Sequence, residues 1–280
     1  MNLALDPLIR ILPVWLRNGV TKGQLSQILE LRLRVGQAVE LVCFRGSSWM
    51  HRIVTEEDLR FCINMASKYS PWTASTIYDG FITIEGGHRI GISCCWKMDE
   101  SGRSSIQKVT SLCIRVAKDY QNISRELYQL HESLLIIGRP GSGKTTLLRD
   151  LIRQISSHRE GAICVVDERK ELFPMSGDVM CFSPGPRTDV LSGCPKGRGI
   201  EMAIRCMSPK IVAIDEITSV NDCKALIEAG WCGVDILATA HASSVDDLMK
   251  RPVYKPLLNC GVFRSVVIMN ADKSWSVERM

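Results

Sequence analysis

Residues 138–145 read Gly138-Arg139-Pro140-Gly141-Ser142-Gly143-Lys144-Thr145, directly after the apolar run Leu134-Leu135-Ile136-Ile137. They match the phosphate-binding loop pattern G-x-x-x-x-G-K-[ST] at every fixed position. In such a loop, glycines let the backbone wrap around phosphates, while N–H groups and the next helix N-terminus supply positive potential. The lysine reaches the outer phosphates and the Thr hydroxyl faces Mg²⁺. We therefore predict a nucleoside triphosphate site over Gly138 to Thr146, with Thr145 as a magnesium ligand.

The composition is that of a globular protein. The 280 residues are 45% apolar and 23% charged, which allows one large domain or two modest ones. The apolar runs are all shorter than the roughly 18 residues that span a bilayer. Asp6, Pro7 and Arg10 interrupt the apolar residues at the amino terminus, so a secretory signal is not indicated. We expect a cytosolic protein.

Cysteine spacing and charge argue against several kinds of site. The twelve cysteines lack C-x-x-C spacing and several lie in apolar runs, which is typical of reduced core residues. The five histidines are scattered and predict no metal site made of protein ligands alone. The net charge of +5 is spread along the chain, so nucleic acid is not an expected partner.

The chain divides into two regions, 1–121 and 122–280, with different patterns. The second region alternates short apolar strands with helical patterns, which predicts an α/β domain with a mostly parallel central sheet. Strands are expected over 133–138, 162–167, 179–183, 211–215, 235–239 and 264–269, and helices over 122–131, after Lys144, and over 199–207, 220–231 and 245–251. The nucleotide belongs at the carboxyl ends of these strands.

The first region has the pattern of a smaller α+β domain. Leu31 and Leu33 alternate with arginines, as in a half-buried strand, and residues 38–44 suggest its neighbour. A helix is expected to open at residues 55–58, and residues 81–92 are expected to form a hairpin that turns at adjacent glycines. This region shows no catalytic pattern.

The apolar strand 211–215 ends at Asp215, and Glu216 follows directly. This pair of carboxylates narrows the range of possible functions. Lys144 alone would permit kinases, GTPases, transporters or motors. Asp215 at a strand tip is suited to hold Mg²⁺ through water, and Glu216 is suited to polarise a water that attacks the γ-phosphate. Because a small-molecule kinase needs no activated water, the pair favours hydrolysis.

Three more carboxylates, Asp167, Glu168 and Glu171, lie at the end of the strand 162–167 and just after it, and His241 follows the strand 235–239. Such crowding of carboxylates is unfavourable unless cations relieve it, and Mg²⁺, Arg169 and Lys170 are available. We assign Glu168 and Glu171 to the positioning of water or metal. His241 is a candidate to contact the γ-phosphate and report its loss.

This order of elements resembles the secretion ATPases of type II and type IV systems and of type IV pili, a branch of the RecA-like hexameric motors. The resemblance covers the second region. It implies an Asp box, a Walker B glutamate and a His box, matched respectively by Asp167, Glu168 and Glu171, by Glu216, and by His241. That family usually has Gly where Asp215 stands, which leaves the catalytic base open between Glu216 and Glu171.

A closer resemblance, to the stage III sporulation protein AA family of endospore-forming bacteria, extends through the first region. Its motifs are matched by residues 30–36, 80–91, 167–169, 189–191, 194–196, 205–209 and 238–241. Arg139 and the stretch Cys94-Cys95-Trp96 depart from the pattern. The resemblance implies a mother-cell cytosolic ATPase that docks on the membrane channel between mother cell and forespore, where late forespore gene expression requires it.

The expected mechanism is ATP hydrolysis with Mg²⁺ in a homo-oligomeric ring, and the resemblance implies that this ring is a hexamer. Arginines from a neighbouring subunit are needed to neutralise charge in the transition state, and the candidates are Arg89, Arg115, Arg198 and Arg205. Two alternatives stay open. One is an ATP-dependent scaffold or switch that hydrolyses negligibly. The other is a RecA-like nucleic-acid motor, although the sequence lacks a basic and aromatic strand-binding surface.

Overall fold

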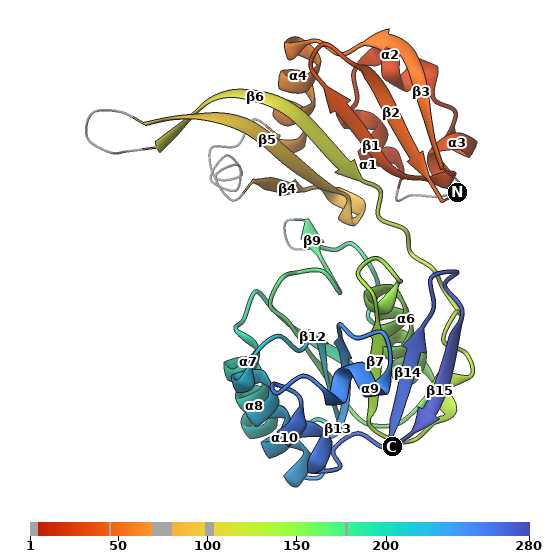
Figure 1. Cartoon of the computed structure of the whole chain (residues 1–280), viewed down its shortest axis with the longest axis vertical. Helices are drawn as coiled ribbons and strands as arrows, with labels where there is room; N and C mark the ends of the chain where they lie inside the picture. Colours follow the sequence, from red (N-terminus) through yellow and green to blue (C-terminus); the bar gives the residue numbers. More distant parts are fainter. Residues whose placement is uncertain (1–4, 45, 69–79, 99–103, 177–178) are drawn as a thin grey trace. The chain divides into compact units, whose positions relative to one another are not determined.

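The computed structural model describes residues 5–44, 46–68, 80–98, 104–176 and 179–280, which form two compact units (Figure 1). Unit 1 comprises Met1–Lys118 and Met175–Phe182. Unit 2 comprises Asp119–Pro174 and Ser183–Met280. A short segment from the second half of the chain thus belongs to unit 1.

Unit 1 is a six-stranded antiparallel sheet, in the order β3-β2-β1-β6-β5-β4, packed with helices. Its elements are α1 (Leu5–Ile11), α2 (Val14–Gly19), α3 (Lys22–Gln27), β1 (Ile28–Arg34), β2 (Ala38–Cys43), β3 (Gly46–Ile53), α4 (Glu56–Ser67), β4 (Phe81–Thr83), the 3-10 helix η1 (Glu85–Gly87), β5 (Arg89–Met98) and β6 (Ser104–Arg115), with the small hairpin β9 (Met175–Ser176) and β10 (Val179–Met180). The core lies between the sheet and helices α1 to α4.

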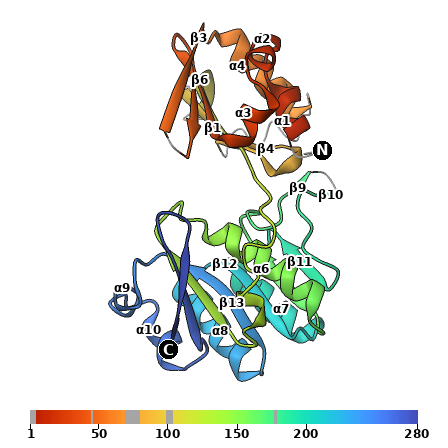
Figure 2. The ribbon, with the colours of Figure 1, turned by 90° about the vertical axis from the view of Figure 1, so that its right-hand side faces the viewer.

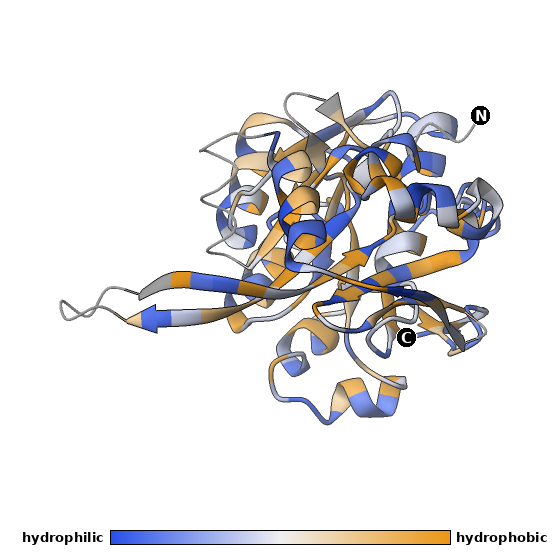
Figure 3. Cartoon of the chain, turned by 90° about the horizontal axis from the view of Figure 1, so that it is seen from above, coloured by the Kyte–Doolittle hydropathy of each residue, from blue (hydrophilic) through white to orange (hydrophobic). Residues whose placement is uncertain are grey.

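Local signals in unit 1 act as the sequence predicts. Thr55 and Asp58 form a reciprocal capping box at the start of α4, which confirms the expected helix. Ile82 pairs with Ile90 across the expected hairpin, whose turn uses Gly86 and Gly87 at φ of 82° and 77°. Strands β5 and β6 continue as a long ribbon that projects from the rest of unit 1, with apolar and polar bands along it (Figure 3).

Unit 2 contains a seven-stranded sheet in the order β11-β8-β12-β13-β7-β14-β15, shown from a second side in Figure 2. Every neighbouring pair is parallel except β14 with β15. The elements are η2 (Leu127–Gln129), β7 (Leu134–Gly138), α6 (Lys144–His158), β8 (Ile163–Asp167), β11 (Thr188–Ser192), α7 (Lys196–Cys206), β12 (Ile211–Glu216), α8 (Val220–Trp231), β13 (Asp235–Ala240), α9 (Val245–Met249), α10 (Lys255–Asn259), β14 (Ser265–Met269) and β15 (Trp275–Arg279). The predicted α/β class is confirmed.

Helices cover both faces of this sheet, which explains why its central strands are continuous apolar runs. Alternate residues of the strands, such as Leu135 and Ile137, share one core with α7 and α8. The opposite face packs against α6, which buries Leu147, Leu148 and Leu151. The sheet is therefore held rigidly behind the loops at its carboxyl edge.

Two sequence-based assignments in this part of the chain are wrong. Residues 122–131 are not a regular helix, because Asn122 has a φ of 63° and the N–H groups of Asn122 and Ser124 donate to the buried Asp150 at 3.0 and 2.9 Å. The strand expected over 179–183 is only β10, which pairs with β9 in unit 1. The place beside β8 belongs to β11, an edge strand in which only Val190 and Leu191 are apolar, too short a run to mark a strand.

All twelve cysteines are free thiols. Among the described residues, no helix is both long and apolar enough to cross a bilayer.

Candidate nucleotide-binding site

The phosphate loop connects β7 to α6 at the carboxyl edge of the sheet. Gly141 and Gly143 have φ values of 74° and 102°, a conformation that favours glycine. Gly138 is needed for a different reason. A Cβ there would lie 2.5 Å from Ser142 Oγ and 2.8 Å from Met269 Cβ, so only glycine fits between β7 and β14.

Lys144 lies inside this loop with its side chain almost fully buried. Its ammonium donates to the carbonyl oxygens of Gly138 and Arg139, at 3.0 and 3.2 Å. It also donates to Nδ1 of His241 at 2.9 Å. Burial lowers the pKa of Lys144, while the charges of Glu216 and Asp215 oppose that shift. The lysine is thus held charged among acceptors, at the position where phosphate oxygens bind in such loops.

Thr145 and Asp215 meet beside the loop. The Thr145 hydroxyl donates to Oδ1 of Asp215 at 3.1 Å. Burial raises the pKa of Asp215 to about 7, and the negative charges of Glu171 and Asp167 add to this rise, whereas the Thr145 hydrogen bond lowers it. A hydroxyl and a carboxylate in this position are oxygen ligands of the kind that Mg²⁺ prefers.

An irregularity in β12 turns neighbouring carboxylates toward the same site. Ala213 pairs with Leu237 and Glu216 pairs with Thr239, so β12 uses one residue more than β13 over this interval. Consecutive strand residues normally point to opposite faces, and a bulge of this kind re-aims the side chain that follows it. Asp215 and Glu216 therefore both reach partners at the phosphate loop.

Glu216 ends a chain of polar contacts that begins at Lys144. His241 Nε2 lies 3.2 Å from Oε1 of Glu216. The Lys144 ammonium can only donate, so Nδ1 of His241 is the acceptor of this hydrogen bond. The ring N–H is then on Nε2, which donates a hydrogen bond to Glu216. Arg169 lies 3.8 Å from the other oxygen of Glu216. The glutamate is thereby oriented from two sides.

Asp167 is fully buried and organises the backbone of the acidic loop. Its carboxylate accepts from the N–H groups of Glu171 and Phe173, both at 2.8 Å. From α6, the buried Arg149 donates to the carbonyl oxygens of Glu171 and Leu172, at 2.8 and 2.6 Å. These bonds tie the loop to α6, and they hold Glu171 close enough for its charge to act on Asp215.

Glu168 is positioned differently from the other carboxylates. Its carboxylate pairs with the buried Lys196 at 3.1 Å, and Lys196 also lies 3.7 Å from Asp222. The structure thus brings together the predicted residues Lys144, Thr145, Asp215, Glu216 and His241, with Glu171 near Asp215. The described ion pair of Glu168 is with Lys196 of α7, which is not one of these site residues.

Three contributors to the site escaped the sequence reasoning in part or in full. Arg149 interrupts the apolar face of α6, a signal that was available in the sequence. Arg169 was expected to relieve the charge of its own loop, and it pairs with Glu216 instead. Lys273 lies in the turn after β14 and donates to the carbonyl of Gly141, and no local pattern marks it.

The residues present fit a nucleotide with Mg²⁺. Ser142 Oγ is buried in the loop without a hydrogen-bond partner, which is rare among the described side chains and leaves an atom available to a ligand. Mg²⁺ in such sites takes only one or two protein ligands and completes its shell with water and phosphate oxygens. Thr145 can supply one such ligand, and Asp215 beside it would hold a metal-bound water.

The raised pKa of Asp215 predicts how stability depends on pH. Its folded pKa of about 7 exceeds the ordinary 3.8, so its contribution to stability is fully present below about pH 4 and is lost as pH rises through about 7. We expect Asp215→Asn to stabilise the protein without Mg²⁺ and nucleotide by about 2–4 kcal/mol at pH 8 and by almost nothing near pH 4. Denaturant unfolding in EDTA from pH 4 to 8 measures this difference.

The exposed Asp189 on β11 offers a matched control for that measurement. Asp189→Asn is expected to change the unfolding free energy by less than about 0.5 kcal/mol throughout. A pH-independent effect of Asp215→Asn would contradict the prediction.

The sheet order, the phosphate loop and the carboxylates of the next strands define the class of P-loop nucleoside triphosphatase folds. The chain belongs to the family described as "Sporulation stage III, protein AA", whose profile matches residues 6–278. Stage III sporulation protein AA of Bacillus subtilis (strain 168) is 35% identical over 266 residues, which cover 90% of this chain and 87% of that protein.

Solved structures of secretion and pilus ATPases share the fold. The ATPase DotB of Legionella pneumophila aligns with a TM-score of 0.62 at 16% identity, covering 96% of this chain and 80% of that chain. The pilus retraction motor PilT with bound ADP aligns with a TM-score of 0.61 at 13% identity, covering 92% and 81%. At these identities the likeness shows the fold, and the roles of single residues rest on the geometry described above.

Proposed function

We propose that this chain is an ATP-hydrolysing motor subunit of the secretion ATPase type, which energises or assembles the channel complex between mother cell and forespore during endospore formation. Membership of the sporulation family and the fold of secretion ATPases support the proposal. The observation that carries it is the placement of Glu216, held by His241 and Arg169 beside the Thr145–Asp215 pair.

Nucleotide binding is assigned to the phosphate loop, residues 138–146. The N–H groups after Gly141 and Gly143 and the N-terminus of α6 attract phosphate, and Lys144 supplies a charge. Thr145 and Asp215 would hold Mg²⁺, Asp215 through water. When bound, Mg²⁺ neutralises charge that develops on the β- and γ-phosphate oxygens.

Glu216 is the base that the geometry favours. It is about three-quarters buried, and His241 and Arg169 orient its two oxygens, so that it can accept a proton from water on the phosphate side. Glu171, the other open choice, lies near Asp215, where its charge suits the metal shell. Glu168 is better explained by its pair with Lys196, which ties the acidic loop to α7.

His241 connects the phosphate loop to the base. It accepts from Lys144 and donates to Glu216 at the same time. When Lys144 turns toward a γ-phosphate, His241 is released to contact the phosphate as well, and its bond to Glu216 changes. Loss of the γ-phosphate restores the first arrangement, which makes His241 suited to report hydrolysis to the rest of the chain.

We propose that a transition-state arginine comes from a neighbouring copy in a homo-oligomeric ring, and the resemblance to the secretion motors makes a hexamer the proposed ring. The four candidates are Arg89, Arg115, Arg198 and Arg205. Arg115 and Arg205 are 68% and 75% exposed, and their pairs with Glu30 and Glu201 are of the weak surface kind. Membrane proteins of the channel complex are the proposed partners, and the proposed place is the cytosolic mother-cell face of the septum.

The test is phosphate release from ATP by the purified protein, alone and with membranes that carry the candidate channel proteins. We expect release that requires Mg²⁺, stops in EDTA and is unchanged by added DNA. Nucleotide binding without hydrolysis under either condition would contradict the motor and favour the ATP-dependent scaffold. Stimulation by DNA would favour a nucleic-acid motor.

A further inference from the structure

We propose that Lys273 is a positioning residue for the phosphate loop. From the turn between β14 and β15, its ammonium holds the backbone carbonyl of Gly141 and so fixes the loop in the form that receives nucleotide phosphates. This inference rests on the nucleotide site proposed above and adds to it a residue from the far end of the chain.

The sheet order explains how Lys273 reaches the loop. Strand β14 lies beside β7 and pairs with it residue for residue, so that Met269 pairs with Gly138. The turn after β14 therefore begins beside the loop after β7. The Lys273 side chain passes over Gly143, where an added Cβ would lie 3.8 Å from Lys273 Cδ. Its ammonium then donates to the Gly141 carbonyl oxygen.

The turn that carries Lys273 is well ordered by its own bonds. Asn270 N–H donates to the Ser274 carbonyl at 2.9 Å, and Lys273 N–H donates to the Asn270 carbonyl at 3.2 Å. Asp272 accepts from the N–H and hydroxyl of Ser274, at 3.0 and 2.6 Å. The hairpin thus fixes the backbone from which the Lys273 side chain extends.

The backbone of Lys273 is in a conformation that glycine would adopt more easily. Its φ is 73°, in the left-handed region where hairpin turns normally use Gly or Asn. A side chain at such a position carries a cost in backbone energy, and strained positions of this kind are frequent at functional sites. The side chain of Lys273 contacts the phosphate loop.

The hydrogen bond from Lys273 to the Gly141 carbonyl, called the tether below, acts on a peptide group that is hydrogen-bonded at both its oxygen and its N–H. The Gly141 carbonyl accepts from Lys273, and the N–H of the same peptide, on Ser142, donates to the Arg139 carbonyl at 3.1 Å. Oxygen and N–H point in opposite directions in a trans peptide, so these two bonds fix its orientation. This orientation also constrains the N–H groups of Gly143 and Lys144, which follow in the loop and are of the kind that bind phosphate in such loops. Gly141 and Gly143, both at positive φ, have no side chains that could hold this part of the loop.

Binding of Mg-ADP to the purified protein, measured by calorimetric titration, tests the tether. Lys273→Met and Lys273→Gly are expected to bind about 5-fold more weakly than wild type, and Lys273→Arg within about 2-fold, because a charged donor restores the bond. Lys273→Gly is further expected to unfold at an equal or higher denaturant concentration without nucleotide, since glycine relieves the positive φ. A merely structural lysine would give lower stability with unchanged affinity.

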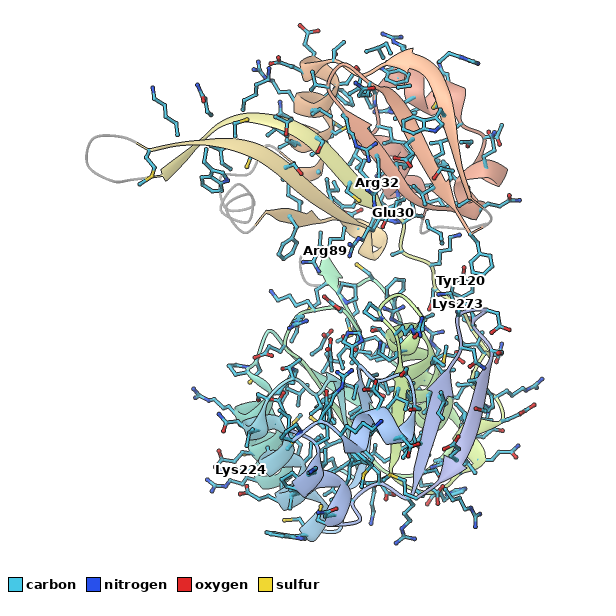
Figure 4. The ribbon with its side chains drawn as sticks, in the orientation of Figure 1. Glu30, Arg32, Arg89, Tyr120, Lys224 and Lys273 are labelled. Carbon is cyan, nitrogen blue, oxygen red and sulfur yellow. The ribbon has the colours of Figure 1, made fainter. Side chains whose placement is uncertain are left out.

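Two control variants separate the tether from general effects. Lys224→Met removes an exposed lysine of α8, which lies far from Lys273 within unit 2 (Figure 4). Ser208→Gly relieves another positive φ, of 46°, just before β12 at the opposite edge of the sheet. Both are expected to bind Mg-ADP as wild type does.

The outcomes distinguish this inference from the proposed function. Wild type that binds Mg-ADP, with Lys273→Met and Lys273→Gly equal to it, would overturn the tether alone. Wild type that binds no Mg-ADP would overturn the proposed nucleotide site and the tether with it.

Discussion

The Glu216→Gln substitution is expected to lower ATP hydrolysis by about 10²–10³-fold while Mg-ADP affinity stays within about 3-fold of wild type. Glutamine keeps the size of the side chain and an oxygen that accepts from His241 Nε2, so the site stays folded. It cannot take a proton from water, and it loses the ion pair with Arg169. Steady-state phosphate release and calorimetric binding measure the two quantities separately.

Glu168→Gln is the matched control, because it makes the same chemical change one loop away. Its partner Lys196 keeps Asp222 at 3.7 Å, so we expect hydrolysis within about 3-fold of wild type. Glu171→Gln tests whether Glu171, rather than Glu216, is the catalytic base. If hydrolysis is lost in Glu171→Gln and kept in Glu216→Gln, Glu171 is the base and the assignment made here is incorrect.

The Lys144→Ala substitution is expected to weaken nucleotide binding by at least about 100-fold and to remove measurable hydrolysis. Lys144 is the buried cation of the phosphate loop, and without it phosphate oxygens would meet backbone N–H groups and hydroxyls but no buried positive charge of the loop. The change also leaves His241 without the donor that fixes its tautomer. Titration with Mg-ADP and phosphate release from ATP measure both effects.

The folded state should survive this substitution. Burial lowers the pKa of Lys144, which means that burial makes the charged form less favourable, and alanine removes that cost. Near-wild-type unfolding of Lys144→Ala, with full activity of Lys224→Ala, would show that lost binding reflects the missing charge. Full hydrolysis by Lys144→Ala would mean that the nucleotide site is elsewhere.

Much of unit 2 follows from local pattern. The strands at 134–138, 163–167, 211–216, 235–240 and 265–269 lie within a residue of the expected ones, because each is a short apolar run followed by polar residues. Parallel strands bring those polar residues to one edge, so Lys144, Asp215, Glu216 and His241 could be expected to meet. In unit 1 the capping box at Thr55 was equally readable.

The errors arose where contacts across the chain outweighed local pattern. The segment 122–131 looks helical by spacing, yet the buried Asp150 draws the N–H groups of Asn122 and Ser124 away from a helix. The segment 179–183 is apolar enough for a strand, yet it pairs outside the main sheet. No local sequence pattern indicates that Asp150 accepts from residues 122 and 124, or that β9 pairs with β10.

By itself, the sequence determined which chemical groups stand at the strand ends, because the loop pattern and the alternation of strands and helices are local properties. Only the tertiary structure decided which groups touch. Lys144 and His241 are 97 residues apart, and Lys273 and Gly141 are 132 residues apart. Their contacts depend on the strand order and on the extra residue in β12, which follow from how helices and strands pack together and not from any single segment.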